Sequence, residues 1–593
     1  MSLELLANEI LFDVFEYLSS VDLFHSYNGL NCRFDNLLLG YFRQNKHFDF
    51  RLIYKEDLNL IRRRYLPLFI NEITSIDLSN DDTNPNEIDL FISRLYPLHR
   101  FNNLHSITLY NIYSIEKIIR ILDDLKHMSH LTHLNFKQNQ IQYNPKTLHN
   151  IMNTIWSLPN LTHCCLDLIS NGNCHIMPPT IISCSLKHLS ITNFQCDMES
   201  LLVLYEHTPY IEYLSVKLCD SSNDYPQLPL LYSLTTLNII CEDSFRLVET
   251  LLRKTPNLIN LTIELNNINI IEAKWQDIIQ KHLSSLKTFN LQSNFHIDDY
   301  DNIEDEIDRM INLYQTYFWI EQHKWFIRCI CSSENNSHNI HLHTLPYKFK
   351  NYSINTNEIF LIKSTCPQDQ QYLKYNSVQN LQYNSSSLDD INTNIIQFLN
   401  IRYLTLTLPY DNQFQIIIPR FDNLFYLEIR MDTRTYDDND LFQLQNLINQ
   451  APRLYYLKFY SWSTILTKFE SKNKKNINIK MPPYSIQSSS VRHLNLQGWN
   501  YSGNHQFYNE QQCLSLIQSP LGQQCQYLLI EVDKRANIIH LVQKMKYLRA
   551  LNVRCNDRKD NEELIKWLKP RLSSTCTFAN DSTASNEIRL WIR

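Results

Sequence analysis

Four potential metal ligands, Cys329, Cys331, His341 and His343, are the residues whose types suggest chemistry most directly. In a hairpin, residues two apart share a face, so two thiolates and two imidazoles could converge on zinc. Structural zinc sites, however, typically place two to four residues between paired ligands, and here one residue separates each pair. Cys-Ile-Cys and His-Leu-His also suit ordinary alternating strand residues. We therefore expect no metal and no cofactor, and keep a metal-dependent enzyme built around this hairpin as an alternative.

Other catalytic patterns are missing from the sequence. Gly498 and Gly503 have the outer spacing of a phosphate-binding loop, but Asn504 and His505 follow where lysine and a hydroxyl residue are required. The six glycines of the chain form no triplet for a dinucleotide-binding turn. No serine lies in a glycine-flanked elbow, and no histidine pair has the zinc-hydrolase spacing with an intervening glutamate. We expect a protein that is not an enzyme.

A short apolar unit recurs from residue 73 onward and would place side chains on strands. Its pattern is apolar, two variable, apolar, one variable, apolar, as in Leu131-Thr-His-Leu134-Asn-Phe136. Its first residues fall at positions 73, 104, 131, 161, 186, 211, 234, 258 and 286, and then at 378, 401, 424, 454, 491, 525 and 548. Most steps lie between 23 and 31 residues, the range of leucine-rich repeats. Each unit predicts one strand and a return segment, helical over 115–125, 198–207 and 244–254, and stacked units would bury a continuous core.

The third residue of each unit would face the open side of the sheet, because alternate strand residues point to opposite faces. Neighbouring strands lie about 4.8 Å apart, so rings at this position would stack in rows. Rows of rings with polar tips are typical of protein-binding surfaces. We predict that these rows bind a target protein through His133, His163, His188 and Tyr213 in the first run and Tyr403, Tyr426, Tyr456, His493 and Tyr527 in the second. Two alternatives stay open: rings that only support one another along the sheet, and three imidazoles that form a metal site or a pH sensor.

The repeat is interrupted between residues 298 and 377. Residues 303–318 predict a long helix. Residues 318–331 and 340–347 alternate on both sides of a polar tip, which predicts a β-hairpin inserted between the two runs.

Composition excludes several classes of partner and compartment. The net charge is −6, and basic residues are dispersed apart from the short run 472–475, so we expect no nucleic-acid partner. Acidic residues interrupt the N-terminal apolar positions, and no apolar run is long enough to span a bilayer, so we expect neither a secretory signal nor a membrane partner. Fifteen scattered cysteines suit reduced thiols and predict a cytoplasmic and/or nuclear protein.

The first forty residues predict three short helices. Apolar residues recur every three or four positions over 6–18, which predicts one amphipathic helix, and Asn8 is its expected N-cap. Further helices are expected over 20–23 and 30–38.

This layout resembles an F-box, the helical module by which substrate receptors dock onto the Skp adaptor of cullin-type ubiquitin ligases. That family opens its docking helix with Leu-Pro; Leu6 matches, but Ala7 replaces the proline, while Glu9 and Arg33 also fit the family pattern. Losing proline removes a preset φ at the helix entry. The resemblance implies that the adaptor is bound by Leu6, Ile10, Val14, Phe15, Leu18, Asp22, Leu23 and Phe34. A helical cap that only covers the first repeat is the alternative.

The whole chain is similar to the large invertebrate sets of F-box proteins with degenerate leucine-rich repeats. We therefore expect an α/β fold in which a three-helix F-box precedes a leucine-rich-repeat solenoid, or horseshoe, with one helix–hairpin insertion. The expected divisions are an F-box at 1–45, a helical linker or cap at 46–72, a first repeat block at 73–297, the insertion at 298–377, a second block at 378–560 and a C-terminal cap at 561–593. The resemblance implies a substrate-recognition subunit that binds the Skp adaptor, and through it cullin, together with an unidentified target protein. The alternative is a non-catalytic repeat scaffold whose F-box has decayed.

Overall fold

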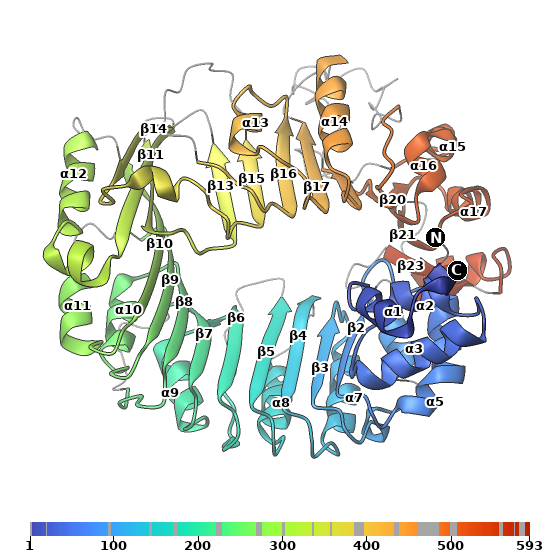
Figure 1. Ribbon diagram of the computed structural model, residues 1–593, viewed down its shortest axis with the longest axis horizontal. Coiled ribbons are helices and arrows are strands. Elements are labelled where there is room, and N and C mark those ends of the chain that lie inside the picture. The colour runs from blue at the N-terminus through green and yellow to red at the C-terminus, as the bar shows by residue number, and fades with distance from the viewer. Residues whose placement is uncertain are drawn as a thin grey trace. The chain divides into compact units, whose positions relative to one another are not determined.

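The structure, a computed structural model, divides the chain into two compact units (Figure 1). Unit 1 comprises Met1–Ile239, Lys254–Leu258 and Ser573–Arg593, and unit 2 comprises Ile240–Arg253 and Ile259–Leu572. The residues that the structure describes are 3–18, 20–51, 53–92, 97–140, 145–169, 176–220, 228–268, 275–298, 303–334, 337–355, 359–384, 396–431, 438–460, 485–498, 507–556, 561–574, 576–579 and 587–592.

The fold is mixed α/β, with two large and mostly parallel sheets. The first has 13 strands in the order β1-β2-β3-β4-β5-β6-β7-β8-β9-β10-β12-β11-β14. The second has 10 strands in the order β13-β15-β16-β17-β18-β19-β20-β21-β23-β22.

Unit 1 contains the first strands of the first sheet and the helices that accompany them. Its helices are α1 (Asn8–Phe15), α2 (Ser20–Tyr27), α3 (Cys32–Gln44), α4 (Lys55–Leu60), α5 (Leu66–Phe69), α6 (Glu87–Phe91), α7 (Ile115–Leu125), α8 (Pro145–Trp156) and α9 (Met198–Glu206). Its strands are β1 (His47–Asp49), β2 (Ser75–Ser79), β3 (Ser106–Tyr110), β4 (His133–Gln140), β5 (His163–Ile169), β6 (His188–Cys196), β7 (Tyr213–Leu218), most of β8 (Thr236–Cys241), β22 (Thr577–Ala579) and β23 (Glu587–Trp591).

Unit 2 contains the remaining strands and helices. Its helices are α10 (Phe245–Leu252), α11 (Trp275–His282), α12 (Ile303–Leu313), α13 (Phe414–Ile417), α14 (Asp438–Gln450), α15 (Glu510–Gln518), α16 (Pro520–Gln524), α17 (Arg535–Lys544) and α18 (Asn561–Leu568). Its strands are β9 (Asn260–Asn266), β10 (Thr288–Asp298), β11 (Phe326–Glu334), β12 (Ser337–Leu345), β13 (Asn351–Asn355), β14 (Ile359–Ser364), β15 (Asn380–Asn384), β16 (Tyr403–Leu408), β17 (Tyr426–Met431), β18 (Tyr456–Phe459), β19 (His493–Asn495), β20 (Tyr527–Val532) and β21 (Ala550–Cys555).

The repeated apolar unit forms the parallel strands of both units. The third residue of every predicted unit is the first residue of a strand, from Ser75 in β2 to Ala550 in β21. Neighbouring strands pair these residues directly, as His133 pairs with His163. Leu134, which follows, is completely buried, as the alternation of a half-buried strand requires. The predicted strand positions are therefore confirmed.

Three of the predicted return helices are also present. Helices α7, α9 and α10 begin after side-chain caps at Ser114, Asp197 and Ser244, each of which accepts a hydrogen bond from a backbone N–H of the first turn. Helix α10 begins after its cap Ser244 and ends at Leu252, so it is shorter than the predicted 244–254. Figure 1 shows α7, α8 and α9 on one side of strands β3 to β7.

The interruption between the two runs forms α12 and an antiparallel group of strands. The predicted hairpin is confirmed as β11 and β12, which pair from Phe326 with Leu345 to Glu334 with Ser337. It begins later than predicted, because Phe318–His323 is a π-helix whose Phe318 and Trp319 rings pack 6.2 and 6.1 Å from Trp325. Helix α12 likewise ends at Leu313 and not at 318. Strands β13 and β14 were not predicted.

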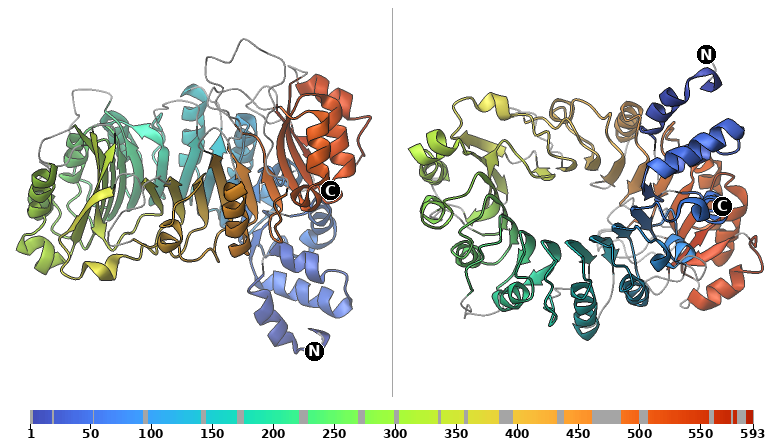
Figure 2. Two further views of the ribbon diagram at one scale, coloured as in Figure 1. Left: turned by 90° about the horizontal axis from the view of Figure 1, so that it is seen from above. Right: turned by 60° about the horizontal axis from the view of Figure 1, so that its bottom comes forward.

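Three helices at the N-terminus pack around a shared aromatic core. The ring of Phe15 lies 5.0 Å from Tyr27 and 5.5 Å from Tyr41, and the Tyr41 hydroxyl donates to the Phe15 carbonyl oxygen at 3.2 Å. Figure 2 shows α1, α2 and α3 as a group that projects from the strands of unit 1. The expected long helix over 6–18 is shorter, since α1 spans Asn8–Phe15 and a 3-10 turn, Leu3–Leu5, precedes it.

The C-terminal hairpin of β22 and β23 belongs to unit 1 and packs against the beginning of the chain. The Asn86 side chain donates to the Phe578 carbonyl oxygen at 2.9 Å, and Lys55 Nζ donates to the Trp591 carbonyl oxygen at 3.3 Å. These bonds join residues 492 and 536 positions apart, and no local pattern in the sequence indicates them.

Two further findings concern the chain's environment. Every described cysteine is a free thiol. Among the described helices, none has both the length and the apolar composition that a membrane crossing requires.

Candidate functional site

The eight side chains that the resemblance assigned to adaptor binding fall into three classes of exposure. Ile10 and Asp22 are exposed, with Ile10 at 48%. Leu6, Val14 and Leu18 are half-buried. The remaining three, Phe15, Leu23 and Phe34, are at most 1% exposed. They are buried residues of the three-helix group, so they offer almost no surface in this structure, and their assignment to adaptor binding stays a prediction.

Exposed apolar side chains that the sequence did not single out occur in the same N-terminal part of the chain as Ile10. Nineteen large apolar side chains are exposed in the described chain, and five of them belong to the first thirty residues. We call these the N-terminal apolar residues: Leu3, Leu5, Ile10, Tyr17 and Leu30. Exposed apolar side chains that adjoin one another are typical of a surface that contacts another protein.

Arg33, on the first turn of α3, holds the entry to α1. Its guanidinium donates to the carbonyl oxygens of Glu4 and Leu6, and its Nη2 and Nε donate to Asn8 Oδ1 at 2.7 and 3.1 Å. Asn31 caps α3 by accepting from two backbone N–H groups and also donates to Glu4 Oε1 at 3.1 Å. The prediction that Asn8 caps α1 is wrong, because Arg33 occupies its side-chain oxygen and the N-cap position is Ala7, which offers no side chain for capping.

Ala7 has a backbone conformation that proline would adopt. Its φ is −63° and its ψ is 153°. Among the described residues, its N–H donates no backbone hydrogen bond. Ala7→Pro is therefore expected to raise the stability of the N-terminal helices by about 0.4–1 kcal/mol, since the unfolded chain loses freedom and the folded chain loses no bond. Hydrogen exchange of α1 measures this effect, and faster exchange in the variant would contradict it.

The first row of rings is stacked as predicted. The rings of His133 and His163 lie 4.0 Å apart at 11°, those of His163 and His188 lie 4.0 Å apart at 14°, and Tyr213 follows at 5.6 Å. Their lone pairs lie in nearly parallel ring planes, so they do not converge on one point as metal ligands must. The stacked geometry therefore argues against the metal alternative.

The tautomers of two imidazoles in this row follow from their threonine neighbours. Thr132 Oγ1 donates to the His105 carbonyl oxygen at 3.0 Å and lies 2.9 Å from His133 Nδ1. Because the hydroxyl proton is already used, Nδ1 carries the proton and Nε2 is left as an acceptor. Thr162 makes the same pair of contacts beside His163, at 3.1 and 2.8 Å. The row can thus accept hydrogen bonds from donors on a bound protein.

Two imidazoles of this row, those of His133 and His163, have a lowered pKa because they are partly buried. Partial burial, reinforced by His133 and His188, lowers the pKa of His163 to about 4. The unfolded residue binds a proton near pH 6.5, so this imidazole contributes stability that is complete above pH 6.5 and is lost as pH falls toward 4. An NMR titration of the His163 C2 proton is expected to show a midpoint near pH 4, absent in His163→Phe. A midpoint near 6.5 for that proton would contradict the stacked arrangement.

The second row is open at one end and buried at the other. Tyr403 is 45% exposed, and Tyr426 and Tyr456 are half-buried. His493 and Tyr527 are only 4% and 2% exposed, so they offer almost no surface in this structure, and their role in target binding stays a prediction. The His493 ring lies 3.9 Å from Tyr456, and β20, which Tyr527 begins, is buried on both faces.

An ion-paired carboxylate lies beside the exposed part of this row. Glu428, two residues after Tyr426, accepts from Lys458 Nζ at 2.9 Å and from Arg430 Nη2 at 3.0 Å. Burial alone would raise the pKa of Glu428, but the two cations outweigh burial and lower it. The open face of unit 2 therefore carries paired charges at this point.

The hairpin separates the four potential zinc ligands onto two faces. Directly paired residues of antiparallel strands share a face, and Ile330 pairs with His341, whereas Cys329 pairs with Leu342. The histidines therefore lie on the face opposite to the cysteines. Burial raises the pKa of the Cys331 thiol to about 12, which keeps it protonated. The zinc alternative has no geometric support.

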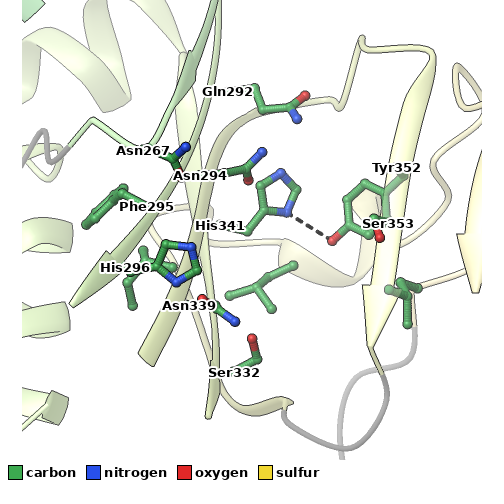
Figure 3. Close-up of a pocket in the computed structure, with 13 residues that line it drawn as sticks. Asn267, Gln292, Asn294, Phe295, His296, Ser332, Asn339, His341, Tyr352 and Ser353 are labelled. Atoms are coloured by element: carbon green, nitrogen blue, oxygen red, sulfur yellow. Dashed lines mark hydrogen bonds between the residues drawn. The ribbon is translucent and has the colours of Figure 1, made fainter. Parts of the chain in front are cut away.

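The histidine face of the hairpin lines a cavity of about 220 Å³ within unit 2. Its walls come from β10, β11, β12 and β13, and Figure 3 shows the side chains that project into it. They include Gln292 and Asn294 on β10, His341 on β12 and Tyr352 on β13. The sequence interpretation missed this cavity, although polar residues alternate along β10 beyond the repeated unit, which was an available signal.

Two comparisons with known proteins were made by sequence. No protein-family model matches the chain, and no curated protein matches its sequence. The interpretation of the site therefore depends on its geometry. Two features weighed in the sequence, the loop at 503–505 and the basic run 472–475, lie outside the described residues.

Proposed function

We propose that this chain is the substrate-recognition subunit of a Skp–cullin–F-box ubiquitin ligase. In this proposal residues 1–45 form an F-box that binds the Skp adaptor, the parallel strands form a leucine-rich-repeat solenoid, and its open face binds a target protein. The observation that carries the proposal is the concentration of exposed apolar side chains in the first thirty residues. Exposed apolar surface of this kind favours a protein partner.

The three helices can hold such a surface in place. Their interior is filled by Phe15, Tyr27 and Tyr41, so the apolar residues left outside are not needed for the core of the group. Arg33 fixes the segment that carries Leu3 and Leu5 against α3. An ordered surface loses less conformational freedom on binding, which favours affinity.

The function proposed for the rest of the chain is positioning. The stacked row His133, His163 and His188 and the exposed tyrosines offer rings and hydrogen-bond acceptors along neighbouring strands. A target bound there would be brought close to the other ligase subunits, which raises the effective concentration of the reacting groups. No catalytic residue of this chain takes part, and the proposed compartment is the cytoplasm and/or the nucleus.

A scaffold without a ubiquitin role is the second candidate. Burial of Phe15, Leu23 and Phe34 favours the scaffold, because a helical cap needs these residues only as its core. The two candidates differ in whether the Skp adaptor is retained.

Co-purification with the Skp adaptor tests the proposal. The wild-type chain is expected to retain the adaptor, and the variant carrying Ile10→Asp and Leu18→Asp is expected to lose it, because both substitutions place charge on side chains outside the core. Unchanged circular dichroism would show that the variant still folds. A wild-type chain that retains no adaptor would leave only the scaffold function.

A further inference from the structure

The cavity in unit 2 is small, polar and free of charged lining residues. Its volume of about 220 Å³ lies below the range of drug-sized pockets and fits a group of about the size of one amino-acid side chain. Amide, hydroxyl and imidazole groups line it, together with apolar side chains, and no Lys, Arg, Asp or Glu is among the lining residues that the structure describes. A charged ligand would lose its hydration without gaining an opposite charge.

His341 forms a polar anchor at the cavity wall. Its Nδ1 lies 3.2 Å from the Tyr352 hydroxyl, which reaches across from β13, as Figure 3 shows. Its Nε2 is buried and has no hydrogen-bond partner among the described residues. Burial lowers the pKa of His341 to about 4, so the ring is neutral near pH 7. An apolar occupant would leave Nε2 without a partner, which is unfavourable.

Asn294 stands directly beside this anchor. It pairs with His341 across β10 and β12, so the two side chains share one face. The Asn294 amide can both donate and accept a hydrogen bond, whereas Nε2 of the neutral imidazole can only donate or only accept, depending on the tautomer. Neighbouring Gln292 lies 2.9 Å from the Tyr347 hydroxyl, which also donates to the Asn351 carbonyl oxygen at 2.8 Å.

A buried polar chain supports the wall behind these residues. The Tyr375 hydroxyl lies 2.6 Å from His343 Nε2 and accepts from Arg328 Nη1 at 3.0 Å, and Arg328 pairs with Asp369 at 2.5 Å. Arg328 and His343 are completely buried. A wall held by such a network is preorganised for binding.

We propose that this cavity binds an uncharged carboxamide, such as the side chain of a glutamine or asparagine. A carboxamide donates and accepts at once, so it can pair with the Asn294 amide and still satisfy either tautomer of His341 at Nε2. The carboxamide could come from a bound polypeptide or from a free small molecule. This assignment does not depend on adaptor docking, so each proposal can fail while the other stands.

Ligand-observed NMR and calorimetry on the full chain test the assignment with three matched probes. N-acetylglutamine amide carries the carboxamide, N-acetylglutamate amide replaces it with a charge, and N-acetylmethionine amide replaces it with an apolar group. The glutamine probe is expected to bind with a Kd of about 1 mM or tighter, and the other two at least about tenfold more weakly. The same glutamine within a longer peptide distinguishes the polypeptide source by binding more tightly than the free probe.

Asn290→Leu is the matched control for Asn294→Leu, because both residues lie on β10. Asn294→Leu is expected to remove binding of the glutamine probe, and His341→Phe to weaken it at least about tenfold. Asn290→Leu, on the same face of β10 and outside the cavity, is expected to leave binding unchanged. No saturable binding of the glutamine probe, equal binding of all three probes, or equal loss in Asn290→Leu and Asn294→Leu would overturn the assignment. Thermal unfolding of each variant shows that it is folded.

Discussion

Asp369→Ala is expected to lower the local stability of the hairpin region by about 3–5 kcal/mol, because it leaves the Arg328 guanidinium buried without its counter-charge. Arg328 is completely buried, and its Nη2 lies 2.5 Å from Asp369 Oδ1. Burial alone would lower the pKa of Arg328, but Tyr375 and Asp369 more than offset burial, and the pKa is raised. Because an arginine side chain keeps its proton in proteins, Arg328 stays charged in the variant and has to be accommodated in the core.

Hydrogen exchange of β11 and β12 measures this loss at the site, which is preferable to global unfolding for a chain of two units. Asp308→Ala is the matched control, because Asp308 also pairs with a cation of unit 2, Lys363, but its side chain is 54% exposed. Exposed pairs contribute about 0–1 kcal/mol, so the control should exchange almost as the wild type does. Adding Arg328→Met to Asp369→Ala should restore part of the loss. Equal effects of Asp369→Ala and Asp308→Ala would contradict a buried, paired Arg328.

Arg33→Met is expected to release the segment before α1 and, under the proposed function, to weaken adaptor binding by about 10- to 100-fold. The guanidinium makes hydrogen bonds to Glu4, Leu6 and Asn8, and bonds to a charged group contribute about 1.5–3 kcal/mol each. Methionine keeps the apolar stem of the side chain and removes all of these bonds. Leu3 and Leu5 would then no longer be held against α3.

Arg43→Met tests whether this effect is specific to the position. Arg43 lies on the same helix, but it is half-exposed and its nearest carboxylate, on Glu72, is 4.0 Å away. We expect this variant to bind the adaptor as the wild type does. Hydrogen exchange of residues 3–15 should accelerate in Arg33→Met only. Unchanged exchange in Arg33→Met would show that the guanidinium does not hold the segment.

The sequence predicted those features that depend on local spacing. Within a stretch of six residues, the apolar residues Leu131, Leu134 and Phe136 are separated by polar residues. This local pattern alone places the strand and its buried side. The helix caps Ser114 and Asp197 are equally local.

Features that depend on distant residues could not be predicted in this way. The burial of Tyr527 is decided by what covers β20, and the role of Arg33 by carbonyl groups 27 and 29 positions earlier. The bond between Lys55 and Trp591 joins opposite ends of the chain. Alternation gave each strand its two faces, but it carries no information about which face a remote segment covers.

The candidate site was predictable in part. The stacking of His133, His163 and His188 follows from the common position of these residues in the repeat. Adaptor-binding residues were transferred from a family pattern, and such a pattern does not distinguish a side chain that contacts a partner from one that fills the core, as Phe15 does.

Calorimetric titration of the purified Skp adaptor into the full chain tests the central claim most directly. The proposal predicts one adaptor per chain, and a loss of affinity of at least about 100-fold in Ile10→Asp, because a charge would enter the centre of an apolar interface. Leu68→Asp is the matched control, since Leu68 is 52% exposed, close to the 48% of Ile10, and lies on α5 outside the N-terminal apolar residues. Its affinity should equal that of the wild type. Absence of binding by the wild-type chain, or equal losses in Ile10→Asp and Leu68→Asp, would contradict the account.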